Sequence, residues 1–564
     1  MEVLSMRVKD VLSMDNLDRH VRYLSGFEKL SGKPGAHRAV EYMEAVLAES
    51  GIPFKTEVFD EYLCNPVSST VMLADGTVLR SRPRSFSLNC PEGIFAPAVY
   101  DDSNLKKNLN PRQVTERLQS FRGKIVISHG FDERYAKLLE KNGAAGWIQI
   151  WESDEDEIHE DTVSSVWGTP DMDSSLMLLN IPVVCVNKEC GERLIRYCAE
   201  GDREVFLSST VETGVFSVEV PVAYIEGQTD EFVLVSGHYD TWYAGAMDNV
   251  AANAACLEIA RAIHASGKKP LRGIRFAWWA GHSNGRYAGS AWYYDHYFHD
   301  LREHCIAQIN SDLIGSMLGE AVAVITTGLE GKDFPSEIIR SVDPSAPIMY
   351  KRFGRGADQS FWGAEIPYNI MTRYEVLPDH KDTAAPGGSP WWHTVEDTYE
   401  KIGLDVLQKE AEIFSEMVLS FADLPVLPVD FDSYFQQMLD RLEDVDLHSD
   451  DAFSFSECKD AILHLKELAL RSYEAADDSS KNKILKIVAG KMNWLMQTYG
   501  SRHGQDLAYA YGMFPHLTAV RGIYKANTAD SEFLFYMTEF VRQKNRLLYE
   551  ISNTEKELEN VMKG

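Results

Sequence analysis

The stretch from residue 216 to residue 425 alternates between short, almost continuously apolar segments and longer segments with a helical pattern. The apolar segments are FVLVSG at 232–237, IRFAWWA at 274–280, CIAQINSD at 305–312 and IPYNIMT at 366–372. The clearest helical pattern, NVAANAACLEIARAIHA at 249–265, lies between the first two. Apolar strands separated by amphipathic helices are typical of a mostly parallel sheet with helices on both faces. The sequence therefore predicts an α/β fold for this stretch.

Three regions with different patterns indicate three domains. Residues 15–65 contain two helices and an extended segment, so residues 1–65 are predicted to join residues 216–427 in one α/β domain. Residues 66–215 contain short strands such as GKIVISHG and IPVVCV with frequent glycine and proline, which predicts a separate β-rich domain inserted into the first. Residues 428–564 are predominantly helical and are interpreted as a helical domain or dimerisation arm.

The composition and charge exclude several classes of partner. With 45% hydrophobic and 25% charged residues, the chain has the composition of a folded, soluble protein, and its formal net charge is −29 at pH 7. Such a charge repels nucleic-acid phosphates and anionic membrane surfaces, so we expect neither as a partner. The first residues lack the apolar core of a signal peptide, and no stretch approaches the roughly 20 apolar residues of a membrane span. The eight cysteines form no CxxC pair, and we expect a cytoplasmic protein with reduced thiols.

Imidazole and carboxylate side chains follow several of the predicted strands. They are, in chain order, His238 and Asp240 after the first strand, Asp248 before the helix, His282 after the second strand, Asp312 at the end of the third, and His393 in SPWWHTVEDT. Ligands of such sheets gather beyond the carboxyl ends of the strands, so these side chains are expected to meet. Imidazole nitrogen and carboxylate oxygen together suit zinc and neighbouring divalent metals. Asp240, two residues beyond His238, is placed to orient that histidine.

Five motifs extend this pattern to a resemblance with a known family. They are SGHYDT at 236–241, AMDNVAANAA at 246–255, AQINSDLIG at 307–315, GADQSFWGAEIP at 356–367 and HTVEDT at 393–398. In combination they resemble the M28 zinc peptidases, including the branch with an inserted protease-associated domain, over most of residues 15–425. The resemblance implies that residues 66–215 form a protease-associated domain and that the C-terminal helical domain makes a homodimer.

The same resemblance implies a set of metal ligands. It assigns His238 and the metal-bridging Asp248 to SGHYDT and AMDN, Asp312 to NSDLIG, and His393 to HTVEDT. One metal position, formed by Asp248, Asp312 and His393, is complete in this chain. The implied cofactor is one or two divalent ions, with zinc as the first choice and iron, manganese or cobalt as alternatives.

The chain departs from the family pattern after the second strand. Where family members carry two adjacent glutamates, a general base and a metal ligand, this sequence has Gly281-His282-Ser283. Three interpretations stay open. His282 replaces the ligand glutamate and completes a second metal position with His238 and Asp248, or His282 takes the base position and leaves a single metal. In the third, the site is degenerate and His282 only fills a polar pocket.

The resulting hypothesis is a divalent-metal hydrolase that cleaves a peptide or small amide C–N bond by a metal-activated water, with an unusual proton shuttle. The predicted catalytic residues are His282, which is also a candidate metal ligand, and Asp240. Further candidates for proton transfer are Tyr374, Glu375 and Asp295. The alternatives are a metalloenzyme with lyase-type or other small-molecule chemistry, and an inactive homologue used for binding.

The segment from Arg352 to Pro390 is dense in candidate substrate contacts, and further candidates lie in the loop after the second strand and at Trp392. We predict that Arg286, Gln359, Arg373 and Trp392 contact a small peptide or amide-like substrate. Arg286 and Arg373 are suited to hold a substrate carboxylate, because a guanidinium can bind both carboxylate oxygens.

Overall fold

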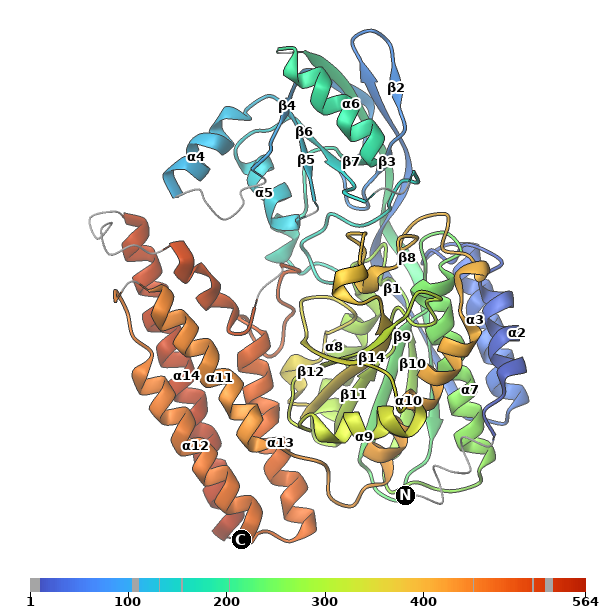
Figure 1. The fold of residues 1–564 in the computed structure, drawn as a ribbon, viewed down its shortest axis with the longest axis vertical. Coiled ribbons are helices and arrows are strands. Elements are labelled where there is room, and N and C mark those ends of the chain that lie inside the picture. The colour runs from blue at the N-terminus through green and yellow to red at the C-terminus, as the bar shows by residue number, and fades with distance from the viewer. Residues whose placement is uncertain are drawn as a thin grey trace.

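A single sheet runs through most of the molecule in the computed structural model (Figure 1). The structure describes residues 11–103, 111–130, 132–153, 156–201, 203–449, 451–509, 512–522 and 531–563. The strands of these residues are β1 (Phe54–Leu73), β2 (Val78–Leu79), β3 (Arg82–Pro83), β4 (Cys90–Tyr100), β5 (Ile125–His129), β6 (Gly146–Ile150), β7 (Val183–Val186), β8 (Glu204–Ile225), β9 (Phe232–His238), β10 (Gly273–Trp279), β11 (Cys305–Asn310), β12 (Ala321–Thr326), β13 (Ile348–Arg352) and β14 (Tyr368–Glu375). Their order is β13-β12-β14-β11-β9-β10-β8-β4-β5-β6-β7-β3, with β1 paired to β8 and β2 paired to β1.

The α/β part of the molecule has parallel strands at its centre. β9 lies between β10 and β11 and runs parallel to both, and β14 runs parallel to β11. Its helices are α2 (Met14–Leu24), α3 (Pro34–Glu49), α7 (Ala251–Ala265), α8 (Ala288–His304), α9 (Asp333–Val342) and α10 (Leu404–Asp423). The connection through α7 leads from β9 to its neighbour β10. The connection through α8 leads from β10 across β9 to β11, in the opposite direction along the sheet. Right-handed crossovers therefore place these two helices on opposite faces, and every residue of β9 is buried.

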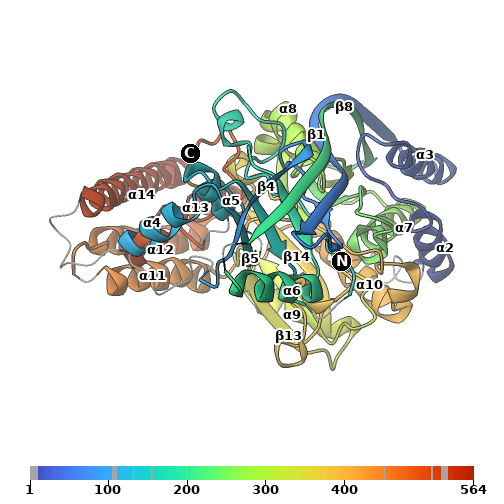
Figure 2. The ribbon, with the colours of Figure 1, turned by 90° about the horizontal axis from the view of Figure 1, so that it is seen from above.

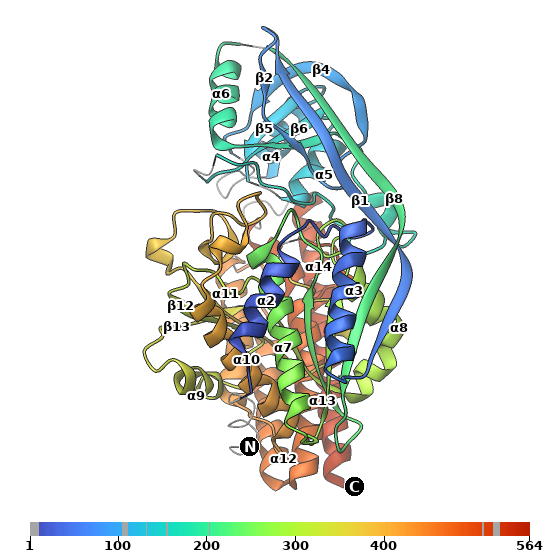
Figure 3. The same ribbon diagram turned by 90° about the vertical axis from the view of Figure 1, so that its right-hand side faces the viewer.

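Two long strands join this part to the insert, by which we mean residues 66–215. β1 and β8 pair antiparallel from Phe54 opposite Ala223 to Leu73 opposite Val205, and Figure 3 shows this ribbon running between the two parts. The predicted boundaries at 66 and 215 thus fall inside strands. In the insert β4, β5, β6 and β7 are parallel neighbours. Its helices are α4 (Pro111–Ser120), α5 (Glu133–Lys141) and α6 (Lys188–Ala199).

The C-terminal region is a bundle of helices at one side of the sheet (Figures 1 and 2). Its long helices are α11 (Phe431–His448), α12 (Ser456–Ala475), α13 (Asp478–Gln497) and α14 (Ser531–Lys563). The segment after α13 contacts both other parts of the molecule. The Gln505 side chain donates to the Ser360 carbonyl at 2.9 Å, and the Ala508 N–H donates to the Ser165 carbonyl at 2.8 Å.

The predicted fold class is confirmed: a mostly parallel sheet is flanked by helices, and the C-terminal region is helical. The sequence did not predict β12 and β13. They extend the sheet beyond β14, and β12 runs antiparallel to β14. No helix in the described ranges is long and apolar enough to cross a membrane, and all eight cysteines are free. The first ten residues of the predicted domain 1–65 lie outside the described residues.

Candidate metal centre

The carboxyl ends of three neighbouring strands bring predicted ligands together. His238 is the last residue of β9, His282 lies in the loop after β10, and Asp312 lies just after β11. Because these strands are parallel, they end at the same edge of the sheet. One ligand atom from each of the three side chains lies within 4.8 Å of the other two. Together with Asp248 and His393 these residues are called the cluster below.

Asp248 lies between two imidazoles of the cluster. Its Oδ1 is 3.0 Å from His238 Nε2, and its Oδ2 is 3.0 Å from His393 Nε2. Trp392 Nε1 donates a hydrogen bond to Oδ2 at 2.7 Å. Burial raises the pKa of Asp248, but the two imidazoles outweigh burial and hold that pKa well below its ordinary value. The ionised carboxylate therefore turns each oxygen to a different histidine, as a ligand that bridges two metal positions must.

Nδ1 of each histidine in the cluster has an oxygen acceptor. Each Nδ1 lies beside an oxygen acceptor: the Asp240 carbonyl for His238 at 2.8 Å, the Glu160 carbonyl for His393 at 2.9 Å, and Asp358 Oδ2 for His282 at 2.7 Å. An oxygen acceptor fixes the proton on Nδ1 and leaves the lone pair on Nε2. In each imidazole Nε2 is therefore the nitrogen that is available to bind a metal.

Asp240 contacts His238 through its backbone and the loop after β10 through its side chain. Its carboxylate is 3.9 Å from His238 Nδ1 and accepts instead the backbone N–H groups of His282 at 3.1 Å and Ser283 at 3.0 Å. Its backbone carbonyl is the group that orients His238. The side chain is fully buried and does not line the pocket described below. The Asp240 carboxylate thus positions the loop that carries His282, and its catalytic role stays a prediction.

The donor atoms of the cluster fit a divalent cation. Two buried atoms at its centre, His238 Nε2 and Asp248 Oδ1, make no hydrogen bond within the part of the chain that the structure describes. Burial lowers the pKa of His238, but the carboxylates of Asp248 and Asp312 outweigh burial and raise it well above its ordinary value. The cluster therefore attracts positive charge, and a metal ion can satisfy the same donors that otherwise bind a proton.

A second set of close donor atoms includes His159 and Asp161 from the insert, with His393. Arg84 excludes His159 as a metal ligand. Its NH1 lies 3.1 Å from His159 Nδ1, and because a guanidinium can only donate, the lone pair of His159 is on Nδ1 and its proton is on Nε2. Burial also lowers the pKa of His159 well below its ordinary value, which keeps the ring neutral. His159 therefore offers an N–H group where the cluster histidines offer lone pairs.

Two aspartates that the sequence did not single out hold the cluster in place. Asp397 in HTVEDT accepts the backbone N–H groups of Met247 and Asp248 at 2.8 Å and 3.0 Å. Asp358 in GADQSF accepts a hydrogen bond from His282 Nδ1. Both residues are buried. Both aspartates belong to motifs of the sequence, and this was the feature that could have identified them. Only the fold shows which group each one contacts.

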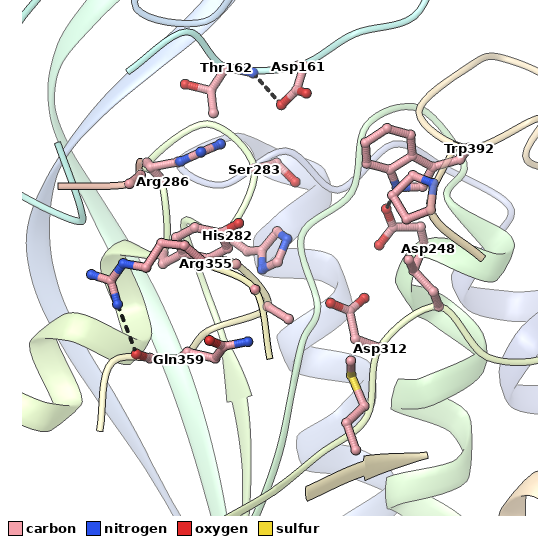
Figure 4. A pocket seen from close by; sticks show the side chains of 18 of the residues that line it. Asp161, Thr162, Asp248, His282, Ser283, Arg286, Asp312, Arg355, Gln359 and Trp392 are labelled. Atoms are coloured by element: carbon pink, nitrogen blue, oxygen red, sulfur yellow. Dashed lines mark hydrogen bonds between the residues drawn. The ribbon is translucent and has the colours of Figure 1, made fainter. Parts of the chain in front are cut away.

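A pocket of about 450 Å³ lies over the cluster (Figure 4). It is lined by all four predicted substrate contacts, Arg286, Gln359, Arg373 and Trp392. The two arginines already have carboxylate partners, because Arg286 NH2 is 2.6 Å from Glu133 Oε1 and Arg373 Nε is 2.8 Å from Glu375 Oε1. In Figure 4, Gln359 and Arg286 lie on one side of His282, and Trp392 and Asp248 lie on the other.

The pocket includes only one of the predicted proton-transfer residues, His282, among the residues described. The Tyr374 hydroxyl donates to Asp343 at 2.9 Å, outside the pocket. Glu375 forms an ion pair with the arginine of its own strand, and Asp295 lines a separate cavity. The structure therefore gives Tyr374, Glu375 and Asp295 contacts outside the cluster.

Comparisons with known proteins match part of the chain to one family of peptidases. The model of Peptidase family M28 matches residues 221–418. Probable glutamate carboxypeptidase VP8 of Zea mays is 26% identical over 274 residues, which are 45% of this chain and 36% of that protein. Aminopeptidase YwaD of Bacillus subtilis (strain 168) is 23% identical over 301 residues, which are 53% of this chain and 62% of that protein. The chain thus spans less than two thirds of the length of these relatives.

Solved structures with the same fold include two aminopeptidases. An aminopeptidase from Aneurinibacillus sp. strain AM-1 superimposes with a TM-score of 0.57 at 20% identity, covering 76% of this chain and 98% of that one. BSAP, a zinc aminopeptidase from Bacillus subtilis, gives a TM-score of 0.57 at 18% identity, covering 73% of this chain and 96% of that one. At these identities the likeness shows a shared fold.

Proposed function

We propose that this chain is a divalent-metal-dependent hydrolase that cleaves a C–N bond of a peptide or small amide. The observation that carries the proposal is Asp248, whose two carboxylate oxygens each lie 3.0 Å from Nε2 of a different histidine. The match of Peptidase family M28 to residues 221–418 supports the same class of reaction. Zinc is the first choice of metal because imidazole and carboxylate donors suit it.

The cluster supplies the metal ligands in this proposal. His238 and His282 lie on one side of Asp248 and His393 on the other, and Asp312 Oδ1 is 3.5 Å from His238 Nε2. His282 acts as a ligand because its Nε2 carries the lone pair. A bound divalent ion would act as a Lewis acid toward the substrate carbonyl and would favour deprotonation of water near neutral pH.

Other residues of the chain orient the substrate and the ligands. Because Arg286 and Arg373 already have carboxylate partners, we assign them to the walls of the pocket. Gln359 Oε1 has no hydrogen-bond partner among the described residues and can accept a substrate N–H. The Trp392 ring lines the pocket, while its Nε1–H holds Asp248. These contacts support a substrate that is a small peptide or amide.

Metal analysis of protein purified without chelator tests the proposal. We expect at least about one equivalent of zinc or a related metal per chain, and turnover of some members of a panel of dipeptides and amino-acid amides. Asp248→Asn should remove the metal because it removes the bridging carboxylate. Asp343→Asn changes a carboxylate that pairs with Lys409, and it should retain the metal.

The possible results separate the hypotheses. Metal-free wild-type protein that also fails to take up zinc would refute both metalloenzyme hypotheses and favour a binding role. Stoichiometric metal without turnover of any peptide or amide would favour lyase-type or other chemistry. Retention of the metal by Asp248→Asn would refute the assigned ligand set.

We also propose that the chain forms a homodimer through its C-terminal helical region. Helix α14 supports this, because it exposes several large apolar side chains: Leu534, Phe535, Val541 and Tyr549. Light scattering after size exclusion should give twice the chain mass of 63.6 kDa. The cytoplasmic location and the protease-associated character of the insert stay predictions.

A further inference from the structure

The loop after β10 lacks a carboxylate that could move protons. Residues 280–287 read AGHSNGRY, and the one acid–base group among them that reaches the cluster is His282. In the proposed function the lone pair of His282 Nε2 binds a metal and is therefore not available to accept a proton. Hydrolysis of a C–N bond still requires a group that takes a proton from water and delivers it to the leaving amine. Another pocket residue must supply that group.

Four carboxylate residues line the pocket within the described ranges: Glu133, Asp161, Asp248 and Asp312. Asp248 and Asp312 face His238 and belong to the ligand set. Glu133 accepts a hydrogen bond from Arg286 at 2.6 Å. This leaves Asp161, for which the described chain shows no ion pair, and which the proposed function does not use as a ligand.

The position of Asp161 is fixed by the insert and by the cluster together. The residue is 8% exposed, and its Oδ1 accepts a hydrogen bond from the backbone N–H of Thr162 at 2.7 Å. The backbone carbonyl of its neighbour Glu160 accepts a hydrogen bond from His393 Nδ1, so the same short segment holds a cluster histidine. A carboxylate oxygen of Asp161 lies within 4.8 Å of a ring nitrogen of His393. Figure 4 shows Asp161 and Thr162 on the far side of Ser283 from Asp312.

Two nitrogen-bearing side chains lie near the Asp161 carboxylate. The neutral His159 ring, whose Nε2 carries the proton, has a nitrogen within 4.8 Å of an Asp161 oxygen. Arg286 also lies close enough for an electrostatic interaction: burial lowers the pKa of Arg286, but the carboxylates of Glu133 and Asp161 help to raise it above its ordinary value. Asp161 thus lies in the pocket beside polar groups from the insert and from the loop after β10.

We propose that Asp161, a residue of the insert, is the proton shuttle of this enzyme. The insert thus supplies the carboxylate that the loop after β10 lacks. The inference rests on the proposed function. As the water oxygen forms a bond to the substrate carbonyl carbon, one water proton moves to the Asp161 carboxylate and the carbonyl π electrons move to the carbonyl oxygen. When the C–N bond breaks, its electron pair stays on nitrogen, which takes the proton from Asp161. The products are a carboxylic acid and an amine, and Asp161 is again a carboxylate.

The test compares Asp161→Asn with Asp161→Ala and with Asp173→Asn, which changes an exposed carboxylate on the surface of the insert. For a dipeptide or amide that the wild-type protein hydrolyses, we expect Asp161→Asn to lower kcat about 10²- to 10⁴-fold with little change in KM. Metal content should stay equal to wild type because Asp161 is not a ligand. Added formate should restore part of the activity of Asp161→Ala, because it supplies the missing carboxylate. Asp173→Asn should match wild type.

Each other result overturns the inference in a recognisable way. Wild-type kcat in Asp161→Asn would show that another group moves the proton. Loss of metal from Asp161→Asn would show that Asp161 is a ligand. Metal-loaded wild-type protein without any turnover would refute the proposed function, and this inference with it.

Discussion

Removing the charge of Asp358 tests whether His282 is a metal ligand. Asp358 is fully buried, with Oδ2 2.7 Å from His282 Nδ1 and Oδ1 accepting from Ser290 Oγ at 2.8 Å. Its φ is +55°, a conformation that asparagine also adopts readily, so Asp358→Asn removes a charge and changes the shape little. Losing the carboxylate behind a metal-binding histidine typically lowers metal affinity about 10- to 100-fold. This corresponds to about 1.4–2.8 kcal/mol of binding free energy.

Calorimetric titration of metal-free protein with zinc, in the presence of a competing chelator, measures this loss. The comparison is between wild type, Asp358→Asn and the control Asp343→Asn, with chemical unfolding to check that each variant is folded. We expect only Asp358→Asn to bind zinc more weakly. Equal zinc affinity in wild type and Asp358→Asn would refute the ligand assignment of His282, and would favour the interpretations in which His282 is a base or fills the pocket.

Three other substitutions test the electrostatics and packing. Burial lowers the pKa of His20 to about 4, so wild-type stability should be full above about pH 6.5 and should fall by about 3 kcal/mol as the pH drops toward 4; urea unfolding of His20→Gln should lack this part of the pH dependence. Gly490→Ala should destabilise the protein by about 1–3 kcal/mol in thermal unfolding, because a Cβ there would lie 2.4 Å from the Glu365 carbonyl oxygen. Trp392→Phe should weaken zinc binding about tenfold in calorimetry because it removes the hydrogen bond to Asp248, and unchanged affinity would contradict that role.

The strand ends of the α/β part could be predicted because their signals are local. Apolar runs such as FVLVSG specify buried strands, and His238 and Asp312 follow them directly. Parallel pairing then brings these residues to one edge whatever the intervening sequence is. β12 and β13 were missed, although β12 is a fully buried apolar run. β13 is only partly buried, so its apolar pattern is weak.

The tautomers of the cluster histidines could not be predicted from sequence. Each depends on a contact with a residue from a different part of the chain. His393 Nδ1 donates to the Glu160 carbonyl, which lies 233 residues away in the insert. His159 has the opposite tautomer only because Arg84 folds against it. Asp240 was placed near His238 correctly by its spacing, but the loop that its carboxylate binds is set by the tertiary fold.

Charge balance explains why Asp358 matters to a cluster without the glutamate pair. With His282 as a neutral ligand, the cluster carries two negative charges, from Asp248 and Asp312. Two divalent ions would bring four positive charges into this buried site, and an uncompensated buried charge is costly. Asp358 adds one negative charge beside the cluster, because its carboxylate is hydrogen-bonded to the imidazole of His282. Metal binding at the position that includes His282 therefore depends on Asp358 more than metal binding at the position that includes His393 does. Asp358→Asn should lower the number of bound ions toward one before it removes metal altogether.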